Sequence, residues 1–113
     1  MNINTHIDQE VYTIFLEGDL DASSSTEVDK ALLLAAKSNK PHIWIDCRSL
    51  NYISSTGLGV FLYYMQHFKD NNQALVLFNM SAKIKDVFNI LGIDALLTIL
   101  TSREEAMQLA AKR

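Results

Sequence analysis

The sequence predicts an α/β fold built on a mixed, mostly parallel sheet with four helices, in the order β-β-α-β-α-β-α-β-α. Short runs rich in β-branched and aromatic residues alternate with segments whose apolar residues recur every three or four positions. The runs at 43–45 and 74–78 are apolar on both faces, which is typical of strands covered on two sides. Since strands alternate with helices, we expect right-handed crossovers between parallel strands.

The first two strands predict an N-terminal hairpin, the antiparallel part of the sheet. Residues 3–7 alternate between apolar and polar, and Val11–Leu16 is rich in β-branched and aromatic residues. We expect the following Glu-Gly-Asp-Leu-Asp segment, residues 17–21, to end the second strand. Ser24, with Glu27 three residues later, then predicts a capping box that opens the first helix.

The middle of the chain predicts a central strand and a second helix. Pro41 ends the loop after the first helix, and His42–Asp46 reads as a strand followed by a loop. The second helix opens at Gly57. Its core-facing stripe consists of Leu58, Phe61, Leu62, Met65 and Phe68.

The last third predicts two more strands and two more helices. Ala74–Phe78 is a continuous apolar strand, and Ser81 caps a helix that Gly92 ends. Leu96–Leu100 predicts a short strand, and the Ser-x-x-Glu pattern at 102–105 predicts a capping box for the C-terminal helix.

Length and charge limit the kind of protein this is. The 113 residues fit a single domain spanning 1–113. A net charge of -3 argues against nucleic acid or an anionic membrane as the partner, since both require a basic surface. Cys47 is the one cysteine, so no internal disulfide forms, and no secretory signal is visible. We therefore expect a cytoplasmic protein.

Three loops should meet at the carboxyl ends of the strands, the edge where α/β sheets bind ligands. One carries Asp19 and Asp21, one runs from Asp46 to Thr56, and one spans 79–81. The aspartates suit turns and caps, and they also predict an acidic rim. The residues form no metal-ligand, dinucleotide or nucleophile motif, so we expect no metal, no cofactor and no enzyme activity.

Three adjacent hydroxyl residues, Ser54, Ser55 and Thr56, stand directly before Gly57 at the start of the second helix. A hydroxyl here can cap the helix by accepting a hydrogen bond from a free backbone N–H. The same position suits an anion, because the helix dipole and unpaired N–H groups point there. The residues alone leave two readings open, a plain cap and a serine that gains and loses a phosphate.

The Ser54–Val60 segment, Ser-Ser-Thr-Gly-Leu-Gly-Val, resembles the helix-opening motif of the STAS-domain anti-sigma factor antagonists. The segment at 17–21 is similar to the family's Gly-x-Leu-Asp turn. Element order and length also match, so the resemblance covers nearly the whole chain and implies the STAS fold.

The resemblance implies a partner switch in bacteria. The unphosphorylated antagonist binds an anti-sigma factor that is also a serine kinase of the histidine-kinase-like ATPase type, and so frees a sigma factor. Phosphorylation in the 54–56 loop releases it, and a serine phosphatase reverses the step. The alternative is a STAS subunit with a scaffolding or transport-accessory role, in which the loop is only a cap.

The acceptor in this family is a hydroxyl immediately before the glycine, which implies Ser55 or Thr56. We favour Ser55, because its primary hydroxyl is less crowded, and we expect Thr56 to cap the helix. Ser54 stands where the family usually has Asp, so a carboxylate beside the acceptor is missing. Asp21 and Asp46 are expected near the phosphate. The expected partner surface around it consists of Asp21, Ser54, Ser55, Thr56 and Gly57.

The second helix shows a further apolar face. At about 100° per residue, Val60, Tyr63, Tyr64 and His67 lie opposite the core stripe, where a surface helix usually has polar residues. Two interpretations stay open, packing against a neighbouring helix and a partner surface beside Ser55. The partner-surface hypothesis assigns Val60, Tyr64 and His67 to binding.

Overall fold

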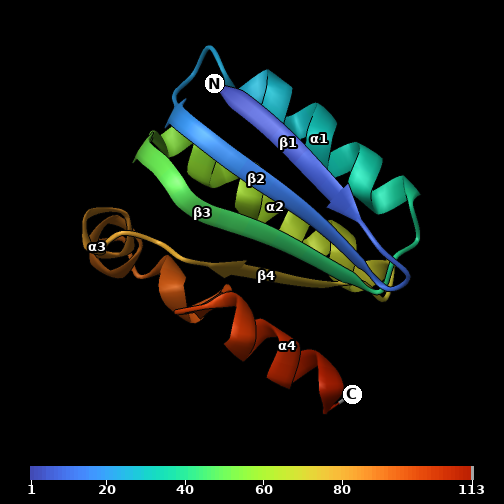
Figure 1. The fold of residues 1–113 in the computed structure, drawn as a ribbon. Coiled ribbons are helices and arrows are strands. Elements are labelled where there is room, and N and C mark those ends of the chain that lie inside the picture. Colours follow the sequence, from blue (N-terminus) through green and yellow to red (C-terminus); the bar gives the residue numbers. More distant parts are fainter. Residues whose placement is uncertain (113) are drawn as a thin grey trace.

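The computed structural model describes residues 1–112, which form one five-stranded sheet with helices on both faces (Figure 1). The elements are β1 (Asn2–Ile7), β2 (Val11–Leu20), α1 (Ser25–Lys37), β3 (His42–Ile53), α2 (Ser55–Asp70), β4 (Ala74–Phe78), α3 (Ala82–Ile90), the 3₁₀-helix η1 (Ile93–Ala95), β5 (Thr98–Leu100) and α4 (Arg103–Ala111). The strand order across the sheet is β1-β2-β3-β4-β5. β1 and β2 pair antiparallel and the other neighbours pair parallel, so the predicted hairpin and mixed sheet are confirmed.

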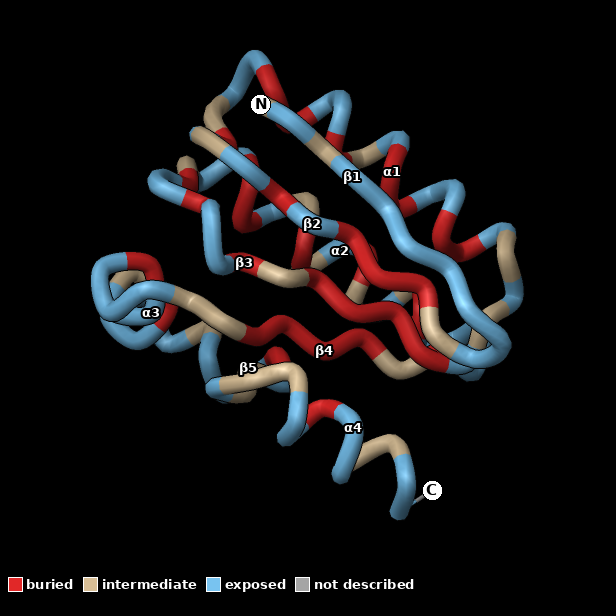
Figure 2. The backbone as a smooth tube through the Cα atoms, viewed as in Figure 1, coloured by how far each residue is buried: buried red, intermediate tan, exposed pale blue. Residues whose placement is uncertain are grey.

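The main core lies between the sheet and α1, α2 and α3. It contains the residues of β2, β3 and β4 that face these helices. Parts of these strands are continuously buried in Figure 2, because both faces of the sheet are covered there. A smaller core lies on the opposite face, where Ala106 of α4 packs on Trp44, Val76 and Phe78. The Arg103 guanidinium lies 5.2 Å from the centre of the Trp44 ring, which adds a cation–π contact at the start of α4.

β2 and β3 are longer than the sequence predicted. β2 continues through Gly18 to Leu20, and β3 continues to Ile53. Their ladder contains register shifts between Phe15 and Glu17 and between Gly18 and Asp19. Gly18 has φ +110°, a conformation that favours glycine, so it permits a bulge within the strand where we expected a strand end.

The helix ends mostly follow the predicted caps. The Ser81 and Ser102 hydroxyls accept hydrogen bonds from the N–H groups of Ile84 and Glu105, and Gly92 is left-handed after α3. The predicted capping box at Ser24 is wrong, since its hydroxyl turns back to the Asp19 carbonyl. The strand expected at 96–100 begins only at Thr98, because η1 and the turn after it take up the preceding residues.

Tyr64 is buried against α1, which agrees with the first of the two interpretations, packing against a neighbouring helix, and its assignment to a partner surface is wrong. Its side chain is only 3% exposed and belongs to the main core. Burial raises the pKa of its phenol to about 12, and the nearby Asp29 carboxylate of α1 acts in the same direction. α2 therefore packs on α1 as well as on the sheet, and this two-sided packing widens its buried arc.

We predict that Tyr64→Ala lowers the free energy of unfolding by about 3–5 kcal/mol, as truncation of a buried aromatic does. Phe61→Ala, at a site of 0% exposure in the same helix, should have a similar effect. Tyr63→Ala is the matched control, because that ring is 63% exposed and its loss should change stability by less than about 0.5 kcal/mol. Urea denaturation measures all three, and wild-type stability of Tyr64→Ala would contradict the packing described.

Candidate functional site

The candidate site lies where the ends of β2 and β3 meet the start of α2 (Figure 1). Leu20 and Ile53 are the last paired residues of the two strands. One residue further on, the Ser54 N–H donates to the Leu20 carbonyl at 2.8 Å. This bond holds the turn after β2, which contains Asp21, beside the first turn of α2. Asp21 and the Ser54–Thr56 segment, the hydroxyl loop, are therefore neighbours as expected.

Ser54 caps α2. Its backbone is extended (φ -88°, ψ 169°), and its Oγ accepts a hydrogen bond from the Gly57 N–H at 3.2 Å. Ser54 also supplies the carbonyl that accepts from the Leu58 N–H at 3.0 Å. The expectation that Thr56 caps the helix is therefore wrong, because Thr56 already lies inside the first turn.

Ser55 and Thr56 are the first two residues of α2, and both are exposed. Within residues 1–112, neither hydroxyl has a hydrogen-bond partner. Because Ser54 satisfies the cap, both hydroxyls are left available for chemistry. No acidic residue occupies the first turn of α2, so a phosphate there would face the helix N-terminus without an adjoining carboxylate on that turn.

Gly57 is required by close packing. A Cβ built on it would lie 2.6 Å from Cγ of Leu20 and 3.3 Å from Cγ1 of Ile53. The missing side chain lets α2 approach the ends of β2 and β3 this closely. Gly57 is itself buried, so its predicted place in the partner surface is wrong and its role is to position the loop before it.

Asp21 organises the turn between β2 and α1. Its Oδ1 accepts hydrogen bonds from the N–H and the hydroxyl of Ser23, at 3.0 and 2.7 Å, and from the N–H of Ser24 at 3.0 Å. The Ser23 hydroxyl and the Ser24 N–H hold the pKa of Asp21 below its ordinary value. The geometry thus gives Asp21 a turn-forming role, close to but separate from the hydroxyl loop.

Asp46 is far from this site, and the expectation that it joins Asp21 in an acidic rim is wrong. It lies within β3, opposite Phe15 and Phe78, and seven residues of extended strand carry the chain roughly 23 Å further to Ile53. Its carboxylate accepts from the Arg48 N–H at 3.0 Å and from Nδ2 of Asn79 at 3.2 Å.

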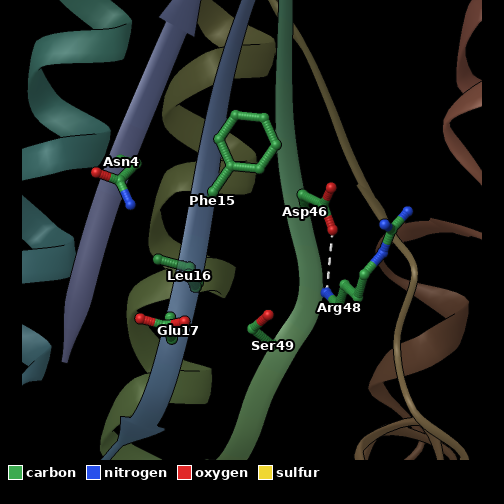
Figure 3. A pocket seen from close by; sticks show the side chains of 7 residues that line it. All are labelled: Asn4, Phe15, Leu16, Glu17, Asp46, Arg48 and Ser49. Carbon is green, nitrogen blue, oxygen red and sulfur yellow. Dashed lines mark hydrogen bonds between the residues drawn. The ribbon is translucent and has the colours of Figure 1, made fainter.

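The loop at 79–81 therefore meets Asp46 and not the hydroxyl loop. Asp46 and Arg48 line a shallow polar pocket on the sheet face opposite α2, together with Phe15 and Glu17 (Figure 3). The loop with Asp21 and the hydroxyl loop meet as predicted. The 79–81 loop does not meet them, because β3 continues to Ile53.

The exposed face of α2 differs from the predicted one. Val60 and His67 are half-buried, whereas Gly59, Tyr63 and Gln66 are exposed. The Tyr63 and His67 rings stack with centroids 6.2 Å apart and planes 19° apart. Gly59, a residue of the Ser54–Val60 motif, is not among the residues predicted for the exposed face, although it lies four residues after Ser55 on the same side of the helix.

The described residues contain no group of three His, Cys, Asp or Glu side chains placed to hold a metal ion. Burial raises the pKa of the Cys47 thiol, which keeps it protonated and unreactive. Among residues 1–112, no helix has both the length and the apolar composition needed to cross a bilayer.

Comparison with known proteins adds family evidence to this geometry. The family model described as STAS domain matches residues 2–106. The chain is 31% identical over 102 residues to the anti-sigma-B factor antagonist of Listeria monocytogenes, an alignment that covers 88% of this chain and 90% of the relative.

Two solved structures represent the same architecture. The Bacillus cell fate determinant SpoIIAA in its phosphorylated form superimposes with a TM-score of 0.72 at 21% identity, over 96% of this chain and 99% of that one. An anti-sigma factor antagonist from Mycobacterium paratuberculosis gives a TM-score of 0.86 at 12% identity, over 96% and 92%. At these identities the superpositions establish the fold.

We predict that Gly57→Ala lowers the free energy of unfolding by about 1–3 kcal/mol, because the added methyl group overlaps Leu20. Gly59→Ala is the matched control within the same helix, since nothing lies within 4 Å of its Cβ position. The control should be more stable than wild type by up to about 1 kcal/mol through helix propensity. Equal stability of the two variants in urea would contradict the close approach described.

The Asp21 turn predicts a pH-dependent contribution to stability. Because the folded pKa of Asp21 is lowered, its contribution is complete above the ordinary carboxyl pKa of about 4 and is lost as pH falls through the folded pKa. The Tm difference between wild type and Asp21→Ala should therefore be larger at about pH 7 than at about pH 2.5. Asp19→Ala, which removes an exposed carboxylate, is the control; an Asp21→Ala effect independent of pH would sink this assignment.

Proposed function

The chain belongs to the STAS domain family, and on that basis we propose that it is an anti-sigma factor antagonist of a partner-switching system. Its unphosphorylated form binds an anti-sigma factor and thereby frees a sigma factor, and phosphorylation in the 54–56 loop releases the complex. The partner is a serine kinase of the histidine-kinase-like ATPase type, a serine phosphatase restores the binding form, and the cycle runs in the cytoplasm. The name of the Listeria relative and the phosphorylated form of SpoIIAA support this cycle.

The single observation that carries the proposal is that one of the three hydroxyl residues caps α2 and the other two are exposed. Ser54 alone satisfies the helix cap, through its bond with the Gly57 N–H. Ser55 and Thr56 are exposed beside it. A kinase can therefore modify either hydroxyl without removing the bond that begins α2.

Ser55 is the preferred acceptor. Its hydroxyl is primary, whereas the Thr56 hydroxyl is crowded by its own methyl group. As the first residue of α2, Ser55 also places a phosphate at the positive end of the helix dipole. The phosphorylated chain should consequently remain folded, so that the switch acts on binding.

Release follows from charge within the contact surface. A phosphate adds about -1.5 to -2 charges at pH 7. Asp19 lies near the end of β2 and Asp21 on the adjoining turn, so the phosphate increases the negative charge already present there. A partner surface that fits the neutral loop would have to desolvate this charge without a matching cation.

We predict that Ser55→Ala keeps the fold, stays bound to the anti-sigma factor in the presence of ATP and accepts no phosphate. Thr56→Ala is the matched control and should be phosphorylated and released like wild type. Phosphopeptide mass spectrometry identifies the site, and co-purification with the kinase measures release. If Ser55→Ala is fully phosphorylated and Thr56→Ala is not, the acceptor is Thr56. Absence of phosphate from both residues in native cells under all growth conditions would favour a scaffolding or transport-accessory role.

A further inference from the structure

β1 is an edge strand with one unpaired side. It pairs with β2 along its whole length, and no strand of residues 1–112 pairs with its other side (Figure 1). The backbone N–H and C=O groups that point away from β2 are therefore free to pair with another strand, because an exposed sheet edge is a template for pairing. The edge on the far side of the sheet offers less, since β5 has only three residues.

The edge of β1 lacks the features that normally prevent such pairing. Proteins protect an exposed edge with charged residues, proline, a bulge or a very short strand. The six residues of β1, Asn-Ile-Asn-Thr-His-Ile, include no Asp, Glu, Lys, Arg or Pro. Their register with β2 runs from Asn2 to Ile7 without a shift, so the strand is regular. The edge is thus regular, without fixed charges and unprotected.

The helix side of β1 is left partly uncovered. Alternate residues of a strand face opposite sides of its sheet, and positions 3, 5 and 7 of β1 lie opposite core residues of β2. These three residues therefore point towards the helix layer. Thr5 is nevertheless exposed and Ile7 is 52% exposed, so α1 does not cover this end of β1. An apolar side chain is left facing water beside a free sheet edge.

α1 adds a second exposed apolar side chain on the same flank of the molecule. Leu34 is 61% exposed. It lies five residues after Asp29, which faces Tyr64 of α2, so at about 100° per residue it is about 140° around the helix from the contact with α2. Leu34 thus points away from α2, and α1 and β1 together form this flank in Figure 1.

We propose that β1 pairs antiparallel with β1 of a second copy of this chain, centred on Thr5, so that the two five-stranded sheets become one continuous sheet across a two-fold axis. With the axis at Thr5, Ile3 lies opposite Ile7 of the second copy on the helix side, and Asn4 lies opposite His6 on the outer side. Each pair joins apolar with apolar or polar with polar, as favourable cross-strand pairs do. The residues of β1 therefore fit a copy of themselves as the occupant.

A second copy also meets the electrostatic requirement. Because β1 carries no Asp, Glu, Lys or Arg, two copies approach without fixed like charges facing each other across the ladder. The same axis turns the α1 flank of each copy, with Leu34, towards the other. The pairing runs along β1, whereas the hydroxyl loop lies at the ends of β2 and β3 and stays accessible, so the dimer does not depend on the proposed function.

The test places a charge on the proposed axis. Thr5→Lys puts two lysines directly opposite each other, which destabilises a strand pair, so it should weaken dimerisation several-fold. Thr98→Lys is the matched control, because it makes the same change at an exposed position of β5, the other edge strand, and should dimerise like wild type. Both variants should melt close to wild type, since neither side chain is buried. Sedimentation velocity over a wide range of protein concentrations measures the dimer.

A charge reversal tests the register. Thr5→Glu alone should also weaken the dimer, whereas an equal mixture of Thr5→Lys and Thr5→Glu should restore it, because opposite charges then face each other across the axis. A wild-type chain that stays monomeric at every concentration would overturn the proposal. So would a dimer that Thr5→Lys leaves intact or that Thr98→Lys dissociates. A mixture no more dimeric than either variant alone would overturn the pairing centred on Thr5.

Discussion

The contact between the first turn of α2 and the end of β2 fixes the geometry of the site. One hydrogen bond, from the Ser54 N–H to the Leu20 carbonyl, joins the loop to the sheet, and the missing side chain of Gly57 lets the helix lie against Leu20. The hydroxyl loop thus has a rigid support on both sides. A larger residue at Gly57 would push α2 away from the sheet and move Ser55 with it.

The cap and the proposed phosphate acceptor are separate residues, so phosphorylation would leave the cap of α2 in place. Ser54 holds the start of the helix through a bond that involves neither Ser55 nor Thr56. A neutral serine in place of the family's aspartate preserves the capping geometry while removing a negative charge from the helix start. Modification of Ser55 can therefore change the charge of the surface without undoing the helix on which it lies.

α2 has a narrow exposed face because it packs on both the sheet and α1. Its buried arc meets the sheet through Phe61 and α1 through Tyr64, which leaves a narrow exposed face centred on Gly59. The same packing explains why an apolar pattern around most of the helix does not by itself identify a partner surface.

The sequence by itself determined the alternation of strands and helices, the hairpin, the caps at Ser81 and Ser102, and the position of three hydroxyls before α2. These features depend on residues close together in the chain, through periodicity and capping chemistry. Only the tertiary structure decided that β2 and β3 run on past Gly18 and Asp46, because a bulge depends on the register between two strands. It also decided that Tyr64 is buried and Gly59 exposed, since the packing of α1 on α2 sets which helix face meets water and is not encoded in the period of α2 alone.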